Sequence, residues 1–334
     1  MDAPRAAGAG PEARERIVTA AVALLAYGGR AALTTRAVAA GAAVAGHDFM
    51  SYLRRSDCNL DPPRLEQQDS TPGRTTSLRH ASIATVTPGC AIAVMGKVPR
   101  AGRSKTRLGA IIGAHAAAAL SGAFLRDTTD NVALAAREAP ILGYVAYAPA
   151  GEEQELRSYM APGTELLLAD GAGPMPDGVD GFGRSLFGAV RDLLAAGHDS
   201  ACVLNSDGPT LPTAFLVRTA ALLAEPGDRA VLGPAEDGGY YVLGLKRPHA
   251  CLFRDIAWST AGVADATRAR AACLGLDLVE LPPWYDVDDV ASLGRLSAAL
   301  ADPVHPGFAS PATRACLDRL GLAATLPRPP AACS

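Results

Sequence analysis

The chain has 334 residues, 49% of them hydrophobic, and a formal net charge of −3. This is enough for one large domain with an additional segment, or for two domains. The charge excludes a basic surface of the kind that holds nucleic acid by its phosphates, so we expect no nucleic-acid partner and only local basic sites.

Cysteine, histidine and leader patterns bear on the compartment. The seven cysteines contain no CxxC pair and the six histidines no HExxH motif, which is typical of reduced thiols and argues against zinc. Acids offset cations ahead of the first apolar stretch, unlike the positive start of a signal peptide. The uncharged run 108–125 reaches the lower limit for a membrane span, but its Ala and Gly content favours a buried helix. We therefore expect a cytoplasmic protein with no membrane partner.

The first 88 residues differ from the rest in their pattern of apolar and polar residues. Residues 13–44 show helical apolar spacing that predicts two helices, and they resemble the start of the DNA-binding domain of TetR-type regulators. No clear third helix and no long ligand-binding helical domain follows. We expect 1–46 to be a helical segment short of a complete domain, and the polar residues 47–88 to be a disordered linker.

From Cys90 onward, short β-type apolar runs alternate with Ala- and Leu-rich helical runs. Strands are predicted at 90–95, 143–147, 165–168, 201–205, 230–233, 240–245 and 278–281. Helices are predicted near 106–125, 183–197, 212–224, 261–274 and 289–299. The alternation predicts an α/β domain over 89–300, with a mostly parallel sheet covered by helices on both faces. Residues 301–334 are expected to hold one helix at 311–320 and a tail.

The loop after the first predicted strand is strongly basic. Between residues 97 and 107 it contains five cations and no acid: Lys97, Arg100, Arg103, Lys105 and Arg107. Backbone amides and the dipole at a helix start, together with cations, are suited to phosphate groups. The loop has neither a Walker A motif nor a GxGxxG motif. A solvated basic loop is the alternative, but the position after a first strand favours phosphate binding.

Carboxylates follow other predicted strands. Asp207 follows the run 201–205 by two positions, and Asp286, Asp288 and Asp289 lie at or just before the start of the helix near 289–299. A turn aspartate and a helix N-cap are the ordinary explanations. Three carboxylates are more than capping requires, and the carboxyl ends of parallel strands are where open α/β sheets bind ligands and where a carboxylate could carry a divalent metal.

Two glycine-rich turns complete the set of candidate segments. Glu236 and Asp237 precede Gly238 and Gly239 between two predicted strands, either as a plain Asp-Gly hairpin or with room for a ligand against bare backbone. Residues 177–197 run through a glycine-rich turn into an amphipathic helix, for which ligand binding and plain capping are equally good explanations.

Six segments, taken in chain order, resemble those of bacterial GT-A-like transferases known as radical-SAM/selenodomain-associated transferase 1. They are KVPRAGRSKTRL, GFGRSL, NSDGPTLP, GPAEDGGYYVLGL, IAWSTAGV and WYDVDDVASL. These are relatives of 2-phospholactate and molybdenum-cofactor guanylyltransferases. The resemblance covers roughly residues 90–300. It implies a nucleotide-diphospho-sugar transferase fold with the nucleotide over the amino-terminal half of the sheet.

The resemblance also implies roles for residues of this chain. A nucleotide-binding group would comprise Lys97, Gly102, Arg103, Lys105, Arg107, Gly183 and Arg184. An acceptor-binding group would comprise Glu236, Asp237, Gly238, Gly239, Tyr240 and Trp258. Asp207 and Asp288 would hold Mg²⁺ or Mn²⁺, and Asp207, Lys105 and Asp237 would be catalytic. Asn205 stands two positions before Asp207, so the Asp-x-Asp pair of many glycosyltransferases is absent.

The expected function is transfer of a nucleotidyl group from a nucleoside triphosphate to a small phosphorylated or hydroxylated acceptor, with pyrophosphate release. The dense cation loop favours a triphosphate because it neutralises more charge than a diphospho-sugar requires. Glycosyl transfer from a nucleotide sugar is the alternative. A DNA-binding regulator built on residues 13–60 and a catalytically idle nucleotide sensor are further alternatives, and the sequence leaves the oligomeric state open.

Overall fold

The computed structural model describes residues 89–322. The predictions for residues 1–46 and for the linker 47–88, including the resemblance to TetR-type regulators, lie outside the described residues. The tail after residue 322 lies outside them as well.

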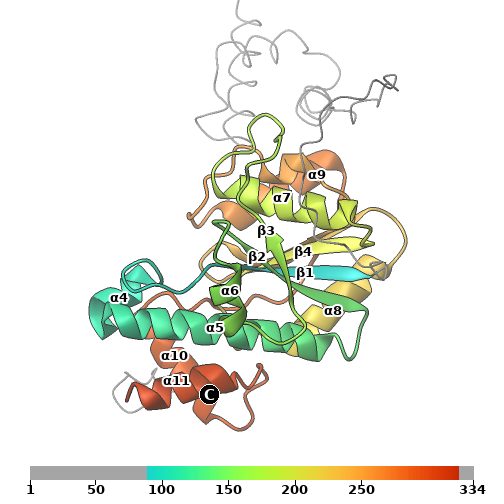
Figure 1. Cartoon of the computed structure of the whole chain (residues 1–334). Coiled ribbons are helices and arrows are strands. Elements are labelled where there is room, and N and C mark those ends of the chain that lie inside the picture. The colour runs from blue at the N-terminus through green and yellow to red at the C-terminus, as the bar shows by residue number, and fades with distance from the viewer. Residues whose placement is uncertain (1–88, 323–334) are drawn as a thin grey trace, which may run out of the picture. The chain divides into compact units, whose positions relative to one another are not determined.

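Seven strands form one sheet in this part of the chain, in the order β3-β2-β1-β4-β6-β5-β7 (Figure 1). They are β1 (Cys90–Gly96), β2 (Ile141–Tyr147), β3 (Glu165–Leu168), β4 (Ser200–Leu204), β5 (Arg229–Pro234), β6 (Tyr240–Leu245) and β7 (Asp277–Glu280). Within this sheet β6 alone runs antiparallel, pairing with β4 and β5. The predicted mostly parallel sheet is therefore confirmed, and the antiparallel β5–β6 pair forms the hairpin that the Asp-Gly turn indicated.

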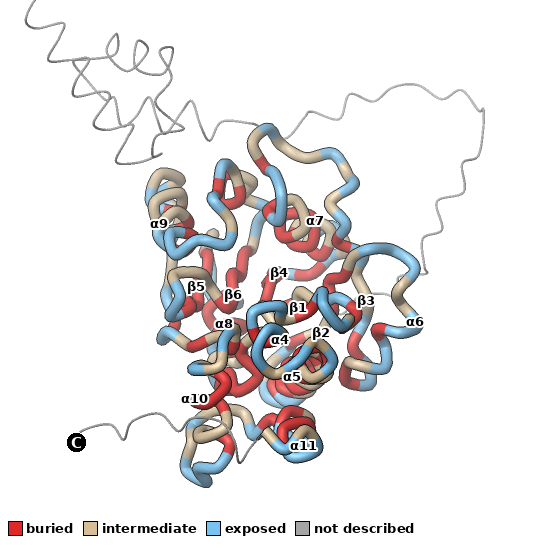
Figure 2. Tube along the Cα trace, turned by 90° about the vertical axis from the view of Figure 1, so that its left-hand side faces the viewer, coloured by how far each residue is buried: buried red, intermediate tan, exposed pale blue. Residues whose placement is uncertain are grey.

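Helices cover both faces of the sheet. They are α4 (Thr106–Ile112), α5 (Ala114–Ala135), α6 (Glu153–Leu156), α7 (Phe182–Ala195), α8 (Thr213–Ala224), α9 (Val263–Leu274), α10 (Val290–Ala301) and α11 (Pro311–Arg319), with 3-10 turns η2 (Arg157–Tyr159) and η3 (Ala250–Phe253). Figure 1 shows α7 and α9 on one face and α5 and α8 on the other, with α10 and α11 beyond α5. The strands between them are mostly buried, and all of β4 is (Figure 2). Burial on both faces explains the continuous apolar runs.

The order of the strands creates a switch point between β1 and β4. The chain passes from β1 outward to β2 and β3, then returns to place β4 on the other side of β1. The loops that leave the carboxyl ends of β1 and β4 therefore diverge. A crevice at such a point is where open α/β sheets bind ligands.

The predicted helix 106–125 differs from the structure. It is divided at Gly113, whose φ of 91° lies outside the helical range, and it continues to Ala135. Glycine adopts this conformation without a Cβ penalty, which separates α4 from α5. The continuation beyond 125 was missed because its buried face contains polar residues, among them Asp127 and Asn131, which break the apolar pattern. In the described part of the chain, no helix is long and apolar enough to span a membrane.

Asp127 explains one of these buried polar positions. Its carboxylate accepts hydrogen bonds from the backbone N–H of Ala312 at 2.9 Å and of Thr313 at 2.6 Å, at the start of α11. A side chain of α5 thus caps a helix distant in the sequence. Burial raises the pKa of Asp127, and these hydrogen bonds oppose the shift.

Replacement of Asp127 is expected to destabilise the chain. Asp127→Ala leaves two N–H groups of α11 without their acceptors, and we expect a loss of about 2 kcal/mol in the free energy of unfolding, measured by urea denaturation. Asp130→Ala is the control, because it removes a carboxylate of the same helix that forms an ion pair with Arg126 alone among the described residues, and it should cost about 0.5 kcal/mol or less. Equal losses in the two variants would contradict the capping role.

Candidate active site

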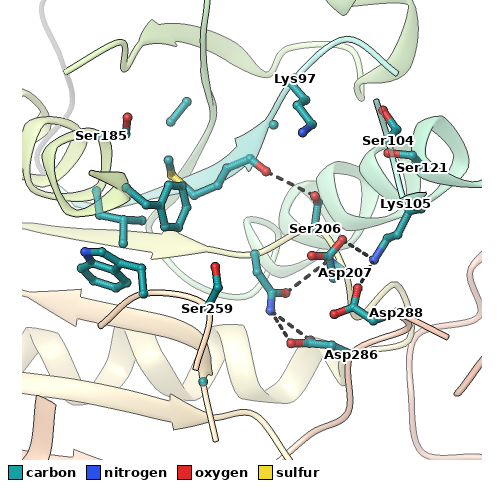
Figure 3. Close-up of a pocket in the computed structure, with 18 of the residues that line it drawn as sticks. Lys97, Ser104, Lys105, Ser121, Ser185, Ser206, Asp207, Ser259, Asp286 and Asp288 are labelled. Atoms are coloured by element: carbon teal, nitrogen blue, oxygen red, sulfur yellow. Dashed lines mark hydrogen bonds and ion pairs between the residues drawn. The ribbon is translucent and has the colours of Figure 1, made fainter. Parts of the chain in front are cut away.

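A cavity of about 970 Å³ opens beyond the carboxyl ends of β1 and β4 (Figure 3). It is lined by the basic loop and the start of α4, the ends of β2 and β3, the first turn of α7, the loop after β4, the β5–β6 turn, residues 258–261 and the segment before α10. Pockets of about 300–1,000 Å³ commonly hold small-molecule ligands and cofactors. The cavity therefore occupies the crevice that the strand order creates.

Lys105 joins two distant carboxylates in this cavity. Its Nζ lies 2.6 Å from Asp207 Oδ1 and 2.9 Å from Asp288 Oδ1, and it donates to the carbonyl of Val287 at 2.8 Å (Figure 3). Burial acts to lower the pKa of Lys105, but the charges of Asp207 and Asp288 outweigh it and the net shift is upward. Lys105 is therefore an ammonium, and each of its three N–H groups has a partner.

The structure brings together the carboxylates that the sequence analysis proposed as metal ligands. Lys105 comes from the start of α4, Asp207 from the loop after β4 and Asp288 from the segment before α10. The carboxylates that the sequence places after different strands thus meet at one cation. Their roles in metal binding and catalysis stay predictions.

Asp286 belongs to the same cluster, although the sequence suggested no separate role for it. Both of its carboxylate oxygens accept from Asn205 Nδ2, at 2.9 and 3.1 Å. Burial, together with the nearby charge of Asp207, raises the pKa of Asp286 to about 7. The available signal was the surplus of carboxylates in this segment. Asp289 is the N-cap of α10 and accepts from the Ser292 N–H at 2.8 Å, so capping leaves Asp286 and Asp288 unexplained.

The cations of the basic loop divide into two groups. Arg100 is paired with Glu152 and Glu155, at 3.1 and 3.0 Å, and Lys105 is paired as described. Lys97, Arg103 and Arg107 also line the cavity and form no salt bridge with any residue that the structure describes. They are the cations that remain for an anionic ligand. Gly102 turns the loop with a φ of 75° and does not line the cavity itself.

The first turn of α7 presents other side chains than the sequence suggested. Arg184 donates from Nε and Nη2 to the carbonyl of Gly171, at 3.0 and 2.6 Å, and thereby ties down the loop before the helix. Gly183 lies behind Trp258, where a Cβ would be 3.0 Å from the indole ring. Phe182, Ser185 and Leu186 line the cavity instead. The nucleotide-binding role of Gly183 and Arg184 stays a prediction, and neither lines the cavity.

The predicted acceptor residues also divide. Asp237, Gly239, Tyr240 and Trp258 line the cavity, whereas Gly238 packs behind it against the backbone of Ala261. Glu236 is turned away as well. Both of its oxygens pair with Arg295, at 2.5 and 3.0 Å, and the Arg295 guanidinium lies 3.9 Å from the centre of the Tyr285 ring. This pair fastens the β5–β6 turn to α10.

The carboxylates fit a hard divalent cation. Asp207 and Asp288 already direct one oxygen each at a single positive charge, and carboxylate oxygens are ligands of Mg²⁺ and Mn²⁺. In residues 89–322, no three His, Cys, Asp or Glu side chains are grouped as a ready metal centre. Mg²⁺ commonly binds through one or two carboxylates plus waters and substrate phosphates. A pair of aspartates therefore suits a cation that arrives with a nucleotide.

The fold is similar to that of solved structures. A candidate nucleotide-diphospho-sugar transferase from Desulfovibrio desulfuricans G20 superposes with a TM-score of 0.59 at 24% identity, over 70% of this chain and 97% of that one. The fold is that of the nucleotide-diphospho-sugar transferases. The model of a family described as uncharacterized proteins conserved in bacteria, DUF2064, matches residues 131–260. No curated protein matches the chain.

Two further structures with lower scores match over most of their length. CMP:2-keto-3-deoxy-manno-octonic acid synthetase in complex with CTP has a TM-score of 0.40 and 12% identity, over 64% of this chain and 98% of that one. Mannosyl-3-phosphoglycerate synthase from Rubrobacter xylanophilus has a TM-score of 0.35 and 14% identity, over 70% and 76%.

Proposed function

We propose that this chain is a nucleotide-dependent transferase that moves a nucleotidyl group from a nucleoside triphosphate to a small hydroxylated or phosphorylated acceptor. The observation that carries the proposal is the meeting of Asp207, Asp288 and Lys105 in a cavity that Lys97, Arg103 and Arg107 also line. A triphosphate carries several negative charges, and catalysis of its displacement consists largely of positioning and charge neutralisation. The cavity offers both signs of charge that this requires.

Each group of residues has a part in the proposed reaction. The three cations without salt bridges would bind the phosphates. Asp207 and Asp288 would hold Mg²⁺ or Mn²⁺, which supplies charge neutralisation at the phosphate oxygens. Asp237 would face the acceptor. An acceptor oxygen forms a bond to the α-phosphorus, the bond from that phosphorus to the pyrophosphate oxygen breaks, and a hydroxyl acceptor gives up its proton to a carboxylate of the site or to water.

Glycosyl transfer from a nucleotide sugar is the second candidate function. The fold favours it, because the Desulfovibrio neighbour is named as a nucleotide-diphospho-sugar transferase. The loop after β4 weighs against it, because Asn205 bonds Asp286 and replaces the first aspartate of an Asp-x-Asp pair. Membership of the radical-SAM/selenodomain-associated transferases and a cytoplasmic location remain parts of the proposal that the sequence alone supports.

Product analysis separates the two functions. The full chain is incubated with Mg²⁺, each of the four nucleoside triphosphates in turn, and a panel of sugar phosphates, polyols and hydroxy acids. We expect pyrophosphate release that depends on one acceptor class and on one base. Consumption of a nucleotide sugar without pyrophosphate release from any triphosphate would support glycosyl transfer and contradict nucleotidyl transfer.

A further inference from the structure

The ammonium of Lys105 lies where the two proposed metal ligands converge. It is within 3 Å of both Asp207 and Asp288, and only 6% of its side chain is exposed. The ring of Phe124 lies beneath it, with 5.5 Å between Nζ and the ring centre. One of the two negative charges of this pair is therefore already balanced by a residue of the chain itself.

A divalent cation and this ammonium cannot share the position. Two positive charges about 3 Å apart repel strongly beside the largely buried Lys105 side chain, and each aspartate has one oxygen directed at Nζ. A cation that binds these two oxygens must therefore displace Nζ. Lysine allows this, because its ammonium is carried on a flexible four-carbon chain with freely rotating donors.

The backbone of Lys105 indicates that its contacts hold it in place. Lys105 precedes α4 in the left-handed conformation, with φ 47° and ψ 50°, which costs a non-glycine residue about 1 kcal/mol or more. The ion pairs, the bond to the Val287 carbonyl and the contact with Phe124 offset that cost. Phosphate groups bound by the neighbouring cations Lys97, Arg103 and Arg107 would offer the ammonium another anion close by.

We infer that Lys105 is a built-in counter-ion that takes the position of the metal in the protein without nucleotide and is drawn onto the phosphates when a nucleotide binds. The inference rests on the proposed function for the identity of the nucleotide, but not for the competition between Lys105 and the metal. It follows that the metal binds weakly to the free protein. Metal and nucleotide then strengthen each other's binding, as thermodynamic linkage requires.

Mn²⁺ binding to the full chain without nucleotide tests the competition. Isothermal titration calorimetry should show that Lys105→Met, which keeps an unbranched side chain one atom shorter and removes its charge, binds one Mn²⁺ at least about tenfold more tightly than the unmodified protein. Lys97→Met is the matched control. It removes the same charge from the same cavity without freeing a carboxylate pair, and should tighten binding by about threefold or less.

A second variant places the metal. Adding Asp207→Asn to Lys105→Met should abolish the tight Mn²⁺ binding, because one of the two carboxylates is lost. If Lys105→Met fails to fold, as judged by its thermal transition, Lys105→Gln replaces it. Its side chain retains an N–H donor but carries no charge, and the same gain in affinity is expected.

The outcomes separate this inference from the proposed function. Affinity for Mn²⁺ that is unchanged in the Lys105 variants, or raised no more than in Lys97→Met, overturns the inference even if the protein turns over nucleotides. A gain that disappears with Asp207→Asn supports it even if no triphosphate is a substrate. Tight binding of Mn²⁺ by the unmodified protein would also overturn it.

Discussion

The Asp207→Asn variant is expected to lose at least about 100-fold in transferase rate while it remains folded. Asp207 is 41% exposed, so an amide of the same size fits without burying an unpaired group. The amide removes the negative charge that faces Lys105 Nζ and that would bind the divalent cation. The rate is measured as initial pyrophosphate release, and the fold is checked by the thermal transition.

Asp289→Asn is the matched control for this variant. It removes one negative charge beside Asp288, but Asp289 serves as the N-cap of α10 and asparagine is an equally good cap. We expect its rate to remain within about threefold of the unmodified protein. If Asp207→Asn releases pyrophosphate at more than one tenth of the rate of the unmodified protein, the proposed role of Asp207 is wrong. Nucleotide binding without turnover in either form would indicate a sensor.

The largest expected effect on stability comes from Gly238→Ala, with a loss of about 3 kcal/mol. Gly238 has a φ of 89°, and a Cβ at this position would lie 2.0 Å from the carbonyl oxygen of Ala261. That oxygen belongs to the backbone, so the turn and residues 259–262 must separate. The Gly238 carbonyl would also lose the bond that it accepts from the Ala264 N–H at 2.9 Å.

This variant should also lose activity, because Asp237 and Tyr240 line the cavity from the same turn. Gly239→Ala is the control for stability. Its φ is not positive, and the nearest atom to an added Cβ is the mobile Oδ1 of Asp237 at 3.1 Å, so we expect a cost below about 1 kcal/mol. Urea denaturation of both variants measures the difference. Similar losses at the two positions would show that Gly238 is not held by the contact with Ala261.

Local patterns in the sequence determined the fold class and the order of its elements. Buried strands such as β4 are continuous apolar runs, and the helices between them have their own period, so each can be recognised without its neighbours. The same patterns located the loops that reach the cavity, including those of Lys105 and Asp207. They could not show that α5 continues past residue 125, because its buried polar residues find partners only in distant segments, as Asp127 does in α11.

Only the tertiary structure shows which side chains form ion pairs with one another. Lys105 and Asp288 are 183 positions apart, and no local period records that their loops meet beyond the same sheet edge. The basic loop looked uniform in sequence, yet its Arg100 is held by α6 while Lys97 stays free of salt bridges among the described residues. Burial beside Asp207 raises the pKa of Asp286. The sequence shows which side chains can carry a charge. Which of them form ion pairs and which are buried depends on how close the folded chain brings each group to its neighbours.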